Sequence, residues 1–159
     1  MSLASQQHRT AKVIQGLDDR MIPIAMEFVE RCNTMGWRVL VHQGRRTWAE
    51  QAALYAQGRT APGPIVTNAK AGQGYHNYGL AIDFVAMDKA GQPMWKLTPW
   101  EMLGEVGEKL GLEWGGRWKK PDEPHLQLSL APIAVLKSIA PKGFIPATWT
   151  PPPPKAEVA

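Results

Sequence analysis

The sequence predicts an α+β fold, a single domain in which helices pack on a small antiparallel sheet. With 159 residues the chain fits one domain of ordinary size. An apolar fraction of 44% is sufficient for a hydrophobic core that needs no disulfides or metals as scaffolding. Amphipathic helical patterns alternate with short β-rich runs along the chain, which is typical of a mixed fold.

The first strong pattern is an amphipathic helix followed by a strand. Apolar residues recur at intervals of four and three from Met21 to Met35, and Gly36 follows the last of them as a helix end. The β-rich run 37–42 then predicts a strand. We therefore expect a helix and a strand to open the domain.

Two further helices are predicted by their N-terminal signals. Thr47 and Glu50 have the spacing of a capping box, and the helix that they begin is expected to continue through Tyr55 until Gly58. The same spacing recurs at Thr98 and Glu101, with a proline at the first helical position. The buried stripe of this second helix is Leu103, Val106 and Leu110, and its two glycines, Gly104 and Gly107, are expected to weaken it.

Strand 80–85 carries a charge where packing does not require one. Leu80, Ile82 and Phe84 share one face, so Asp83 points to the other. A carboxylate there is costly unless its charge is needed. A turn at 88–91, a strand at 125–128 and a helix at 133–139 complete the domain, residues 1–140. Six of the fourteen prolines follow, and residues 141–159 are expected to form a proline-rich extended tail.

Composition excludes several classes of protein. No apolar stretch approaches the roughly 20 residues of a membrane span, and the polar N-terminus lacks the apolar segment of a signal peptide. The single cysteine, Cys32, has apolar neighbours that indicate a buried thiol and cannot form an internal disulfide. The net charge of +4 favours an anionic partner, but the basic residues are scattered, so nucleic-acid binding is not expected.

Two of the four histidines have a carboxylate nearby in turn-rich or strand-edge sequence. His76 precedes Asp83 by seven residues, and Asp122 precedes His125 by three. Two imidazoles and a carboxylate are a common ligand set for catalytic zinc, and an unligated carboxylate beside them can act as general base. The spacing alone is unspecific, whereas His8 and His42 fit solvated and structural roles.

Three ordered blocks carry a resemblance to a known family. The run 74–84, GYHNYGLAIDF, closely resembles the metal-binding signature S-x-H-x-x-G-x-A-x-D of the zinc D-alanyl-D-alanine carboxypeptidase and L-alanyl-D-glutamate endopeptidase superfamily. Residues 111–118 and 122–127 resemble its second metal half, and residues 44–58 resemble its G-Y-R-S segment and following helix. The resemblance covers most of the chain, from about Ile14 to Leu130.

The resemblance implies a role for each candidate residue. His76, Asp83 and His125 would ligate Zn²⁺, and Asp122 would be the general base, since the family's base lies three residues before the last histidine. Glu123 competes with Asp122 for that role. Arg46 would stabilise the oxyanion or hold a substrate carboxylate.

Three residues depart from the family pattern. Gly74 stands in place of the serine, Arg45 in place of the usual tyrosine, and Arg117 where related sequences often carry an acid. None is a proposed ligand, so these departures concern substrate contacts rather than metal binding. Of the nearby Trp114 and Trp118, one can form a wall of the substrate cleft.

The resemblance implies a zinc metallopeptidase that cleaves the L-alanyl-D-glutamate amide of the peptidoglycan stem peptide, as phage endolysins and autolysins do. A D-alanyl-D-alanine carboxypeptidase is the first alternative, and a non-catalytic wall-binding module the second. We expect a monomer without stable membrane insertion, synthesised in the host cytoplasm without a signal peptide and active on the cell wall after release.

Overall fold

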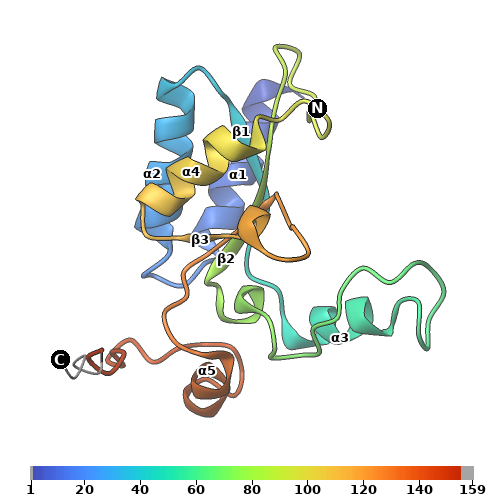
Figure 1. Cartoon of the computed structure of the whole chain (residues 1–159), viewed down its shortest axis with the longest axis vertical. Coiled ribbons are helices and arrows are strands. Elements are labelled where there is room, and N and C mark those ends of the chain that lie inside the picture. Colours follow the sequence, from blue (N-terminus) through green and yellow to red (C-terminus); the bar gives the residue numbers. More distant parts are fainter. Residues whose placement is uncertain (1, 155–159) are drawn as a thin grey trace.

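The computed structural model describes residues 2–154 and contains both helices and strands (Figure 1). Among these residues, no helix is both long and apolar enough to cross a bilayer. The elements in chain order are α1 (Leu3–Gln15), α2 (Ile22–Thr34), β1 (Val39–Gln43), α3 (Trp48–Ala56), the 3-10 helix η1 (Tyr75–Tyr78), β2 (Ala81–Ala86), α4 (Trp100–Lys109), β3 (Glu113–Trp114), the 3-10 helix η2 (Gly115–Arg117), β4 (His125–Gln127) and α5 (Ile133–Ile139).

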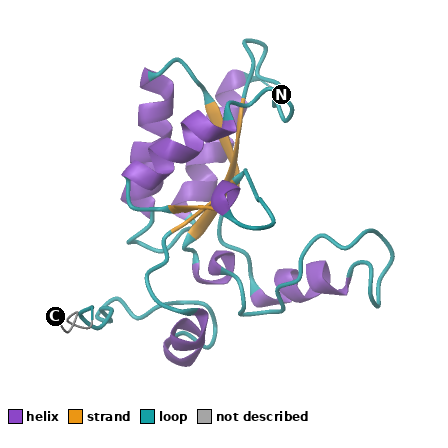
Figure 2. Cartoon of the chain, in the orientation of Figure 1, coloured by secondary structure: helices purple, strands orange, loops and turns teal. Residues whose placement is uncertain are grey.

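The four strands form one antiparallel sheet in the order β1-β2-β4-β3. Helices α1, α2 and α4 gather beside this sheet, while α3 and α5 lie beyond its lower end (Figure 2). The predicted α+β class, with helices packed on a small antiparallel sheet, is therefore confirmed.

Every residue of β2 except Asp83 is buried, on both faces of the strand. Leu80, Ile82 and Phe84 are fully buried, and the Phe84 ring meets Phe28 of α2 edge-on at 4.9 Å between centroids. Asp83 lies on the opposite face and is only partly buried. On that face of β2 the neighbours of Asp83, Ala81 and Val85, are apolar and fully buried, so Asp83 is the one charged side chain of the strand.

Helix α1 precedes the helix that was expected to open the domain, so that expectation is wrong. Its buried positions are Gln6, Thr10 and Ile14, and two of these three are polar. The Gln6 amide donates to the Gly91 carbonyl, and the Thr10 hydroxyl accepts from the Val41 amide. A helix that buries hydrogen-bonded polar groups has no clear apolar stripe, which explains why the pattern did not indicate it.

The two predicted capping boxes have different outcomes. At Thr47 the hydroxyl accepts from the Glu50 amide at 3.1 Å, and the Glu50 carboxylate accepts from the Thr47 amide at 2.8 Å, as predicted. At Thr98 the prediction is wrong, because α4 begins after Pro99 without a side-chain cap. The Thr98 hydroxyl instead accepts from the Ala86 amide and donates to the Met94 carbonyl, which satisfies the end of β2.

The described part of the C-terminal segment is fastened to the domain by two arginines. Arg20 donates to the carbonyls of Pro146 and Trp149 at 2.9 and 2.8 Å. Arg45 donates to the carbonyl of Gly143 at 2.6 Å. Residues 155–159 of the expected tail lie outside the described residues, and the domain boundary at residue 140 stays a prediction.

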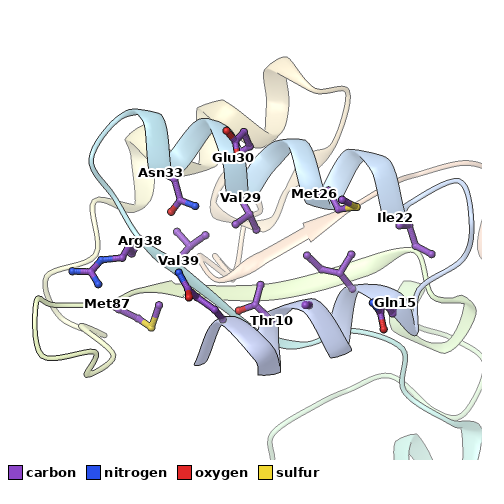
Figure 3. Close-up of a pocket in the computed structure, with 13 residues that line it drawn as sticks. Thr10, Gln15, Ile22, Met26, Val29, Glu30, Asn33, Arg38, Val39 and Met87 are labelled. Carbon is purple, nitrogen blue, oxygen red and sulfur yellow. The ribbon is translucent and has the colours of Figure 1, made fainter. Parts of the chain in front are cut away.

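A groove of about 390 Å³ runs between α1 and α2 (Figure 3). Its walls come from both helices, with Ile22, Met26 and Val29 on the α2 side and Thr10 on α1, and Val39 of β1 also lines it. It shares no lining residue with the polar cleft described below. The two hollows are therefore separate features.

The glycines of α4 allow the helix to approach the sheet closely. A Cβ at Gly104 would overlap the Trp114 indole, and one at Gly107 would overlap the Leu126 side chain. We expect Gly104→Ala to lower the free energy of unfolding by about 1 kcal/mol or more, because overpacking outweighs the gain in helix propensity. Chemical denaturation measures this, with exposed Met102→Ala of the same helix as the control; a more stable Gly104→Ala would contradict the expectation.

The thiol of Cys32 is fully buried in the core, and burial raises its pKa to about 12. Because the thiolate is the reactive form, the native protein at pH 8 should resist a thiol reagent such as Ellman's reagent. Labelling should become complete once denaturant unfolds the chain. Rapid labelling of native protein, at the rate of unfolded protein, would show that the thiol is accessible.

Candidate metal centre and cleft

One cleft, of about 550 Å³, brings together every residue that the sequence predicts for the site. Loop 66–75, strands β2 and β4 and the segment 118–122 contribute to its walls. The predicted residues that line it are Arg46, His76, Asp83, Asp122 and His125. His42 lies outside this lining, in β1, with its ring 5.3 Å from that of Trp95.

Strand pairing and a tight turn deliver the three central side chains. Asp83 of β2 lies directly opposite His125 of β4 in the antiparallel register. His76 lies in η1, and Gly79 turns the chain from η1 into β2 with a left-handed φ of 68°. A Cβ at Gly79 would lie 2.6 Å from the Asp18 amide nitrogen, so both the conformation and the space require glycine here.

The three side chains converge on a common point. Asp83 Oδ1 lies 3.3 Å from His76 Nε2 and 3.3 Å from His125 Nδ1. One ligand atom from each of the three residues lies within 4.8 Å of the other two. Such an arrangement can hold a metal ion.

Hydrogen bonds on the far side of each ring select the nitrogen that faces inward. His76 Nδ1 lies 2.7 Å from the Gly44 carbonyl, so Nδ1–H donates and Nε2 keeps its lone pair. His125 Nε2 lies 2.9 Å from Gln127 Oε1, so Nε2–H donates and Nδ1 is the free nitrogen. Two neutral imidazoles and a carboxylate fit zinc and leave a fourth tetrahedral position for water or substrate.

Asp83 and His125 stabilise each other's charged forms against the effect of burial. Burial alone would raise the pKa of Asp83, but the hydrogen bonds and charges of His125 and His76 hold it well below its usual range. Burial would likewise lower the pKa of His125, and Asp83 reverses this and raises it. Asp83 is therefore ionised, and the site attracts a cation.

Asp122 occupies the rim of the cleft next to His125. Its Oδ2 lies 4.0 Å from His125 Nδ1, and its side chain is 53% exposed. Partial burial raises the pKa of its carboxyl, which makes it a better proton acceptor than an ordinary aspartate. Glu123 does not line the cleft, and its backbone carbonyl accepts from the Trp114 indole at 2.8 Å. Of these two adjacent acids, only Asp122 lines the cleft.

Arg46 is held in the cleft by residues for which the sequence suggested no role. Its Nη1 donates to Gln51 Oε1 at 3.0 Å, and Gln51 is 1% exposed. The Asn77 amide donates to the Arg46 carbonyl at 3.1 Å. Gln51 also donates to the Ala69 carbonyl at 2.8 Å, which ties the guanidinium to the loop that forms a cleft wall. The cation is thereby preorganised.

The structure explains two of the three departures from the family pattern, Arg45 and Arg117, but not Gly74. A Cβ at Gly74 would meet Asn77 Oδ1 at 3.6 Å, so the cleft has room for the family's serine. Arg45 points away from the cleft, donating to the Gly16 carbonyl at 2.9 Å and stacking on Phe144 at 4.4 Å. Arg117 pairs with acids of α4, among them Glu108 at 2.8 Å.

Trp118 and Gln127 complete the cleft beside His125. Trp118 lines the cleft, with its ring 5.1 Å from that of His125, whereas Trp114 is buried. Trp118 is thus the one of the two that forms part of the wall, which the sequence had left open. Gln127 received no role from the sequence, although strand alternation places residues 125 and 127 on one face and was the signal that could have indicated it.

Comparison with known proteins agrees with this geometry. Residues 67–128 match a peptidase M15 family model described as D-alanyl-D-alanine carboxypeptidase. The peptidoglycan L-alanyl-D-glutamate endopeptidase CwlK of Bacillus subtilis (strain 168) is 44% identical over 103 residues, which cover 58% of this chain and 62% of CwlK. The chain thus spans less than two thirds of the length of that relative.

Two crystal structures have a similar fold. The L-Ala D-Glu endopeptidase ChiX of Serratia marcescens superposes with a TM-score of 0.56 at 24% identity, over 77% of this chain and 87% of ChiX. The vancomycin resistance D,D-pentapeptidase VanY, an E175A mutant in complex with Zn(II), gives 0.54 at 17% identity, over 81% of this chain and 80% of VanY. The superfamily resemblance is thus confirmed: residues 67–128, which contain all three candidate metal ligands, match the peptidase M15 model, and the fold is similar to those of the two solved structures.

Proposed function

We propose that this protein is a zinc-dependent peptidase that hydrolyses the L-alanyl-D-glutamate amide bond of the peptidoglycan stem peptide. The observation that carries the proposal is the convergence of His76, Asp83 and His125 beside Asp122 and Arg46 in one cleft. The 44% identity to an L-alanyl-D-glutamate endopeptidase supports this bond rather than another. An endolysin-like role in lysis of the cell wall, after synthesis in a host cytoplasm, is part of the proposal.

Each residue has a defined task in this reaction. His76, Asp83 and His125 would hold a zinc ion, which as a Lewis acid would polarise the scissile carbonyl and make water more acidic. Asp122 accepts a proton from the attacking water and donates it to the leaving amine as the C–N bond breaks. Arg46, held by Gln51, stabilises the negative charge on the carbonyl oxygen or binds a carboxylate of the substrate.

A D-alanyl-D-alanine carboxypeptidase is the second candidate. It is favoured by the description of the matching family model. Both reactions need the same metal ligands, base and cation, so the choice between them depends on how the cleft positions the peptide. The site of cleavage in a substrate that contains both bonds separates the two functions.

Removal of the metal should abolish cleavage of such a substrate. The substrate is a stem peptide that begins with L-Ala-D-Glu and ends with D-Ala-D-Ala. We expect the purified protein to cleave it between L-Ala and D-Glu, and mass spectrometry of the fragments measures this. Activity should disappear with a chelator and return with added zinc, because the ligand set binds the metal reversibly. Loss of one terminal alanine would instead establish the carboxypeptidase, and no cleavage by zinc-loaded protein would favour a wall-binding module.

Replacement of the base should separate catalysis from metal binding. We expect Asp122→Ala to lower kcat by about 100- to 10,000-fold, the usual contribution of general base catalysis, while zinc content stays at the wild-type level. The adjacent Glu123→Ala is the matched control and should retain activity, since Glu123 does not line the cleft. Equal losses in both variants, or loss of zinc from Asp122→Ala, would contradict the assigned role.

A further inference from the structure

We infer that Glu113 is a positioning residue that, acting through Gln127, determines which nitrogen of His125 faces the metal centre. The inference rests on the metal site of the proposed function but not on its substrate. Glu113 lies in β3, directly opposite Gln127 of β4, outside the lining of the cleft. The sequence assigned it no role.

Glu113 is the acceptor at the end of a chain of hydrogen bonds. Its Oε2 lies 3.3 Å from Gln127 Nε2 and accepts from the Ser129 hydroxyl at 2.6 Å. The Ser129 oxygen in turn accepts from Gln127 Nε2 at 3.0 Å. Both bonds of the Gln127 amide nitrogen therefore lead to this carboxylate, one directly and one through Ser129.

The direction of these hydrogen bonds follows from the chemistry of a carboxylate. Ionised Glu113 can only accept hydrogen bonds, so the NH2 end of Gln127 must face it. The carbonyl end of Gln127 must then face His125, where its oxygen lies 2.9 Å from Nε2. A neutral His125 ring then carries its proton on Nε2, and Nδ1, the nitrogen that lies 3.3 Å from Asp83, is the one whose lone pair a metal can use.

The reversed amide would disable the site. With the NH2 group of Gln127 turned toward His125, Nε2 would have to accept, and the proton of a neutral ring would move to Nδ1. Nδ1 would then present N–H instead of a lone pair toward the metal position. A residue that fixes the direction of one amide thus controls the availability of one ligand.

A second donor makes the negative charge of Glu113 necessary. Oε1 accepts from the Trp118 indole at 2.8 Å, and an indole can only donate. The hydrogen bonds from Ser129 and Trp118 lower the pKa of Glu113 and keep it ionised. A glutamine at position 113 has one acceptor oxygen and cannot satisfy Trp118 and Gln127 together.

The first test is the zinc affinity of Glu113→Gln. We expect it to bind zinc about 10-fold more weakly than the wild type, the lower end of the usual effect of residues that orient metal ligands. Competition with a chromophoric chelator measures the affinity directly. The matched control is Glu108→Gln. It removes an acid of α4 that pairs with Arg117 and should leave the zinc affinity unchanged.

The second test uses the double variant Glu113→Gln with Gln127→Glu, which exchanges the two side chains. The exchange restores the direction of the hydrogen-bond chain to His125. The amide introduced in β3 can then donate to the carboxylate introduced in β4 and accept from Trp118, while that carboxylate accepts from His125. We expect recovery of the wild-type zinc affinity. In metal-free protein at alkaline pH, long-range ¹H–¹⁵N NMR should show the Nε2–H form of His125 in the wild type and the double variant, and a mixture in Glu113→Gln.

These outcomes decide the inference independently of peptidase activity. Two results would overturn the inference. One is a folded Glu113→Gln variant with wild-type zinc affinity and an unchanged His125 tautomer, and the other is a folded double variant that does not recover the wild-type zinc affinity. Thermal unfolding monitored by circular dichroism establishes that each variant is folded. Wild-type protein that binds zinc but cleaves no stem peptide would refute the proposed function and leave the role of Glu113 intact.

Discussion

The antiparallel pairing of Asp83 with His125 determines where the rest of the site lies. Main-chain hydrogen bonds between β2 and β4 set this register, so two of the three candidate ligands are placed by the backbone and not by flexible linkers. Strand alternation puts Gln127 on the same face as His125, and the pairing of β3 with β4 puts Glu113 opposite Gln127. A slip of one residue between the two strands would turn one of these candidate ligands into the apolar core, which the buried Ile82 and Leu126 oppose.

The candidate metal site has a negative charge that a bound cation can compensate. Asp83 is held ionised between two imidazoles, and each imidazole donates its outward N–H to a carbonyl oxygen, of Gly44 or of Gln127. With both rings neutral, the cluster has one negative charge and two inward lone pairs. Either a proton or a metal ion can compensate that charge, but only a metal uses all three donors at once.

Much of the site was predictable because its signals are local in sequence. The alternation of side chains in strand 80–85 identified Asp83 as a charge between apolar residues. The capping box at Thr47 located the helix that follows Arg46. Helix α1 was missed because hydrogen-bonded Gln6 and Thr10 replace apolar residues in its buried stripe. The roles of Gln51 and Glu113 depend on contacts across the fold, such as those of Gln51 with the loop at Ala69 and of Glu113 with Ser129, which no spacing along the chain reveals.

The position of Arg45 also bears on how related proteins vary. Its guanidinium joins the Gly16 carbonyl to the carbonyl of Gly143, which lies 98 residues beyond Arg45 in the chain, and stacks on Phe144. A tyrosine, usual at this position in the family, has a single hydroxyl and cannot donate in two directions at once. Residue 45 and the course of the segment that contains Gly143 should therefore covary, so that homologues with tyrosine fasten this segment by other contacts or route it elsewhere.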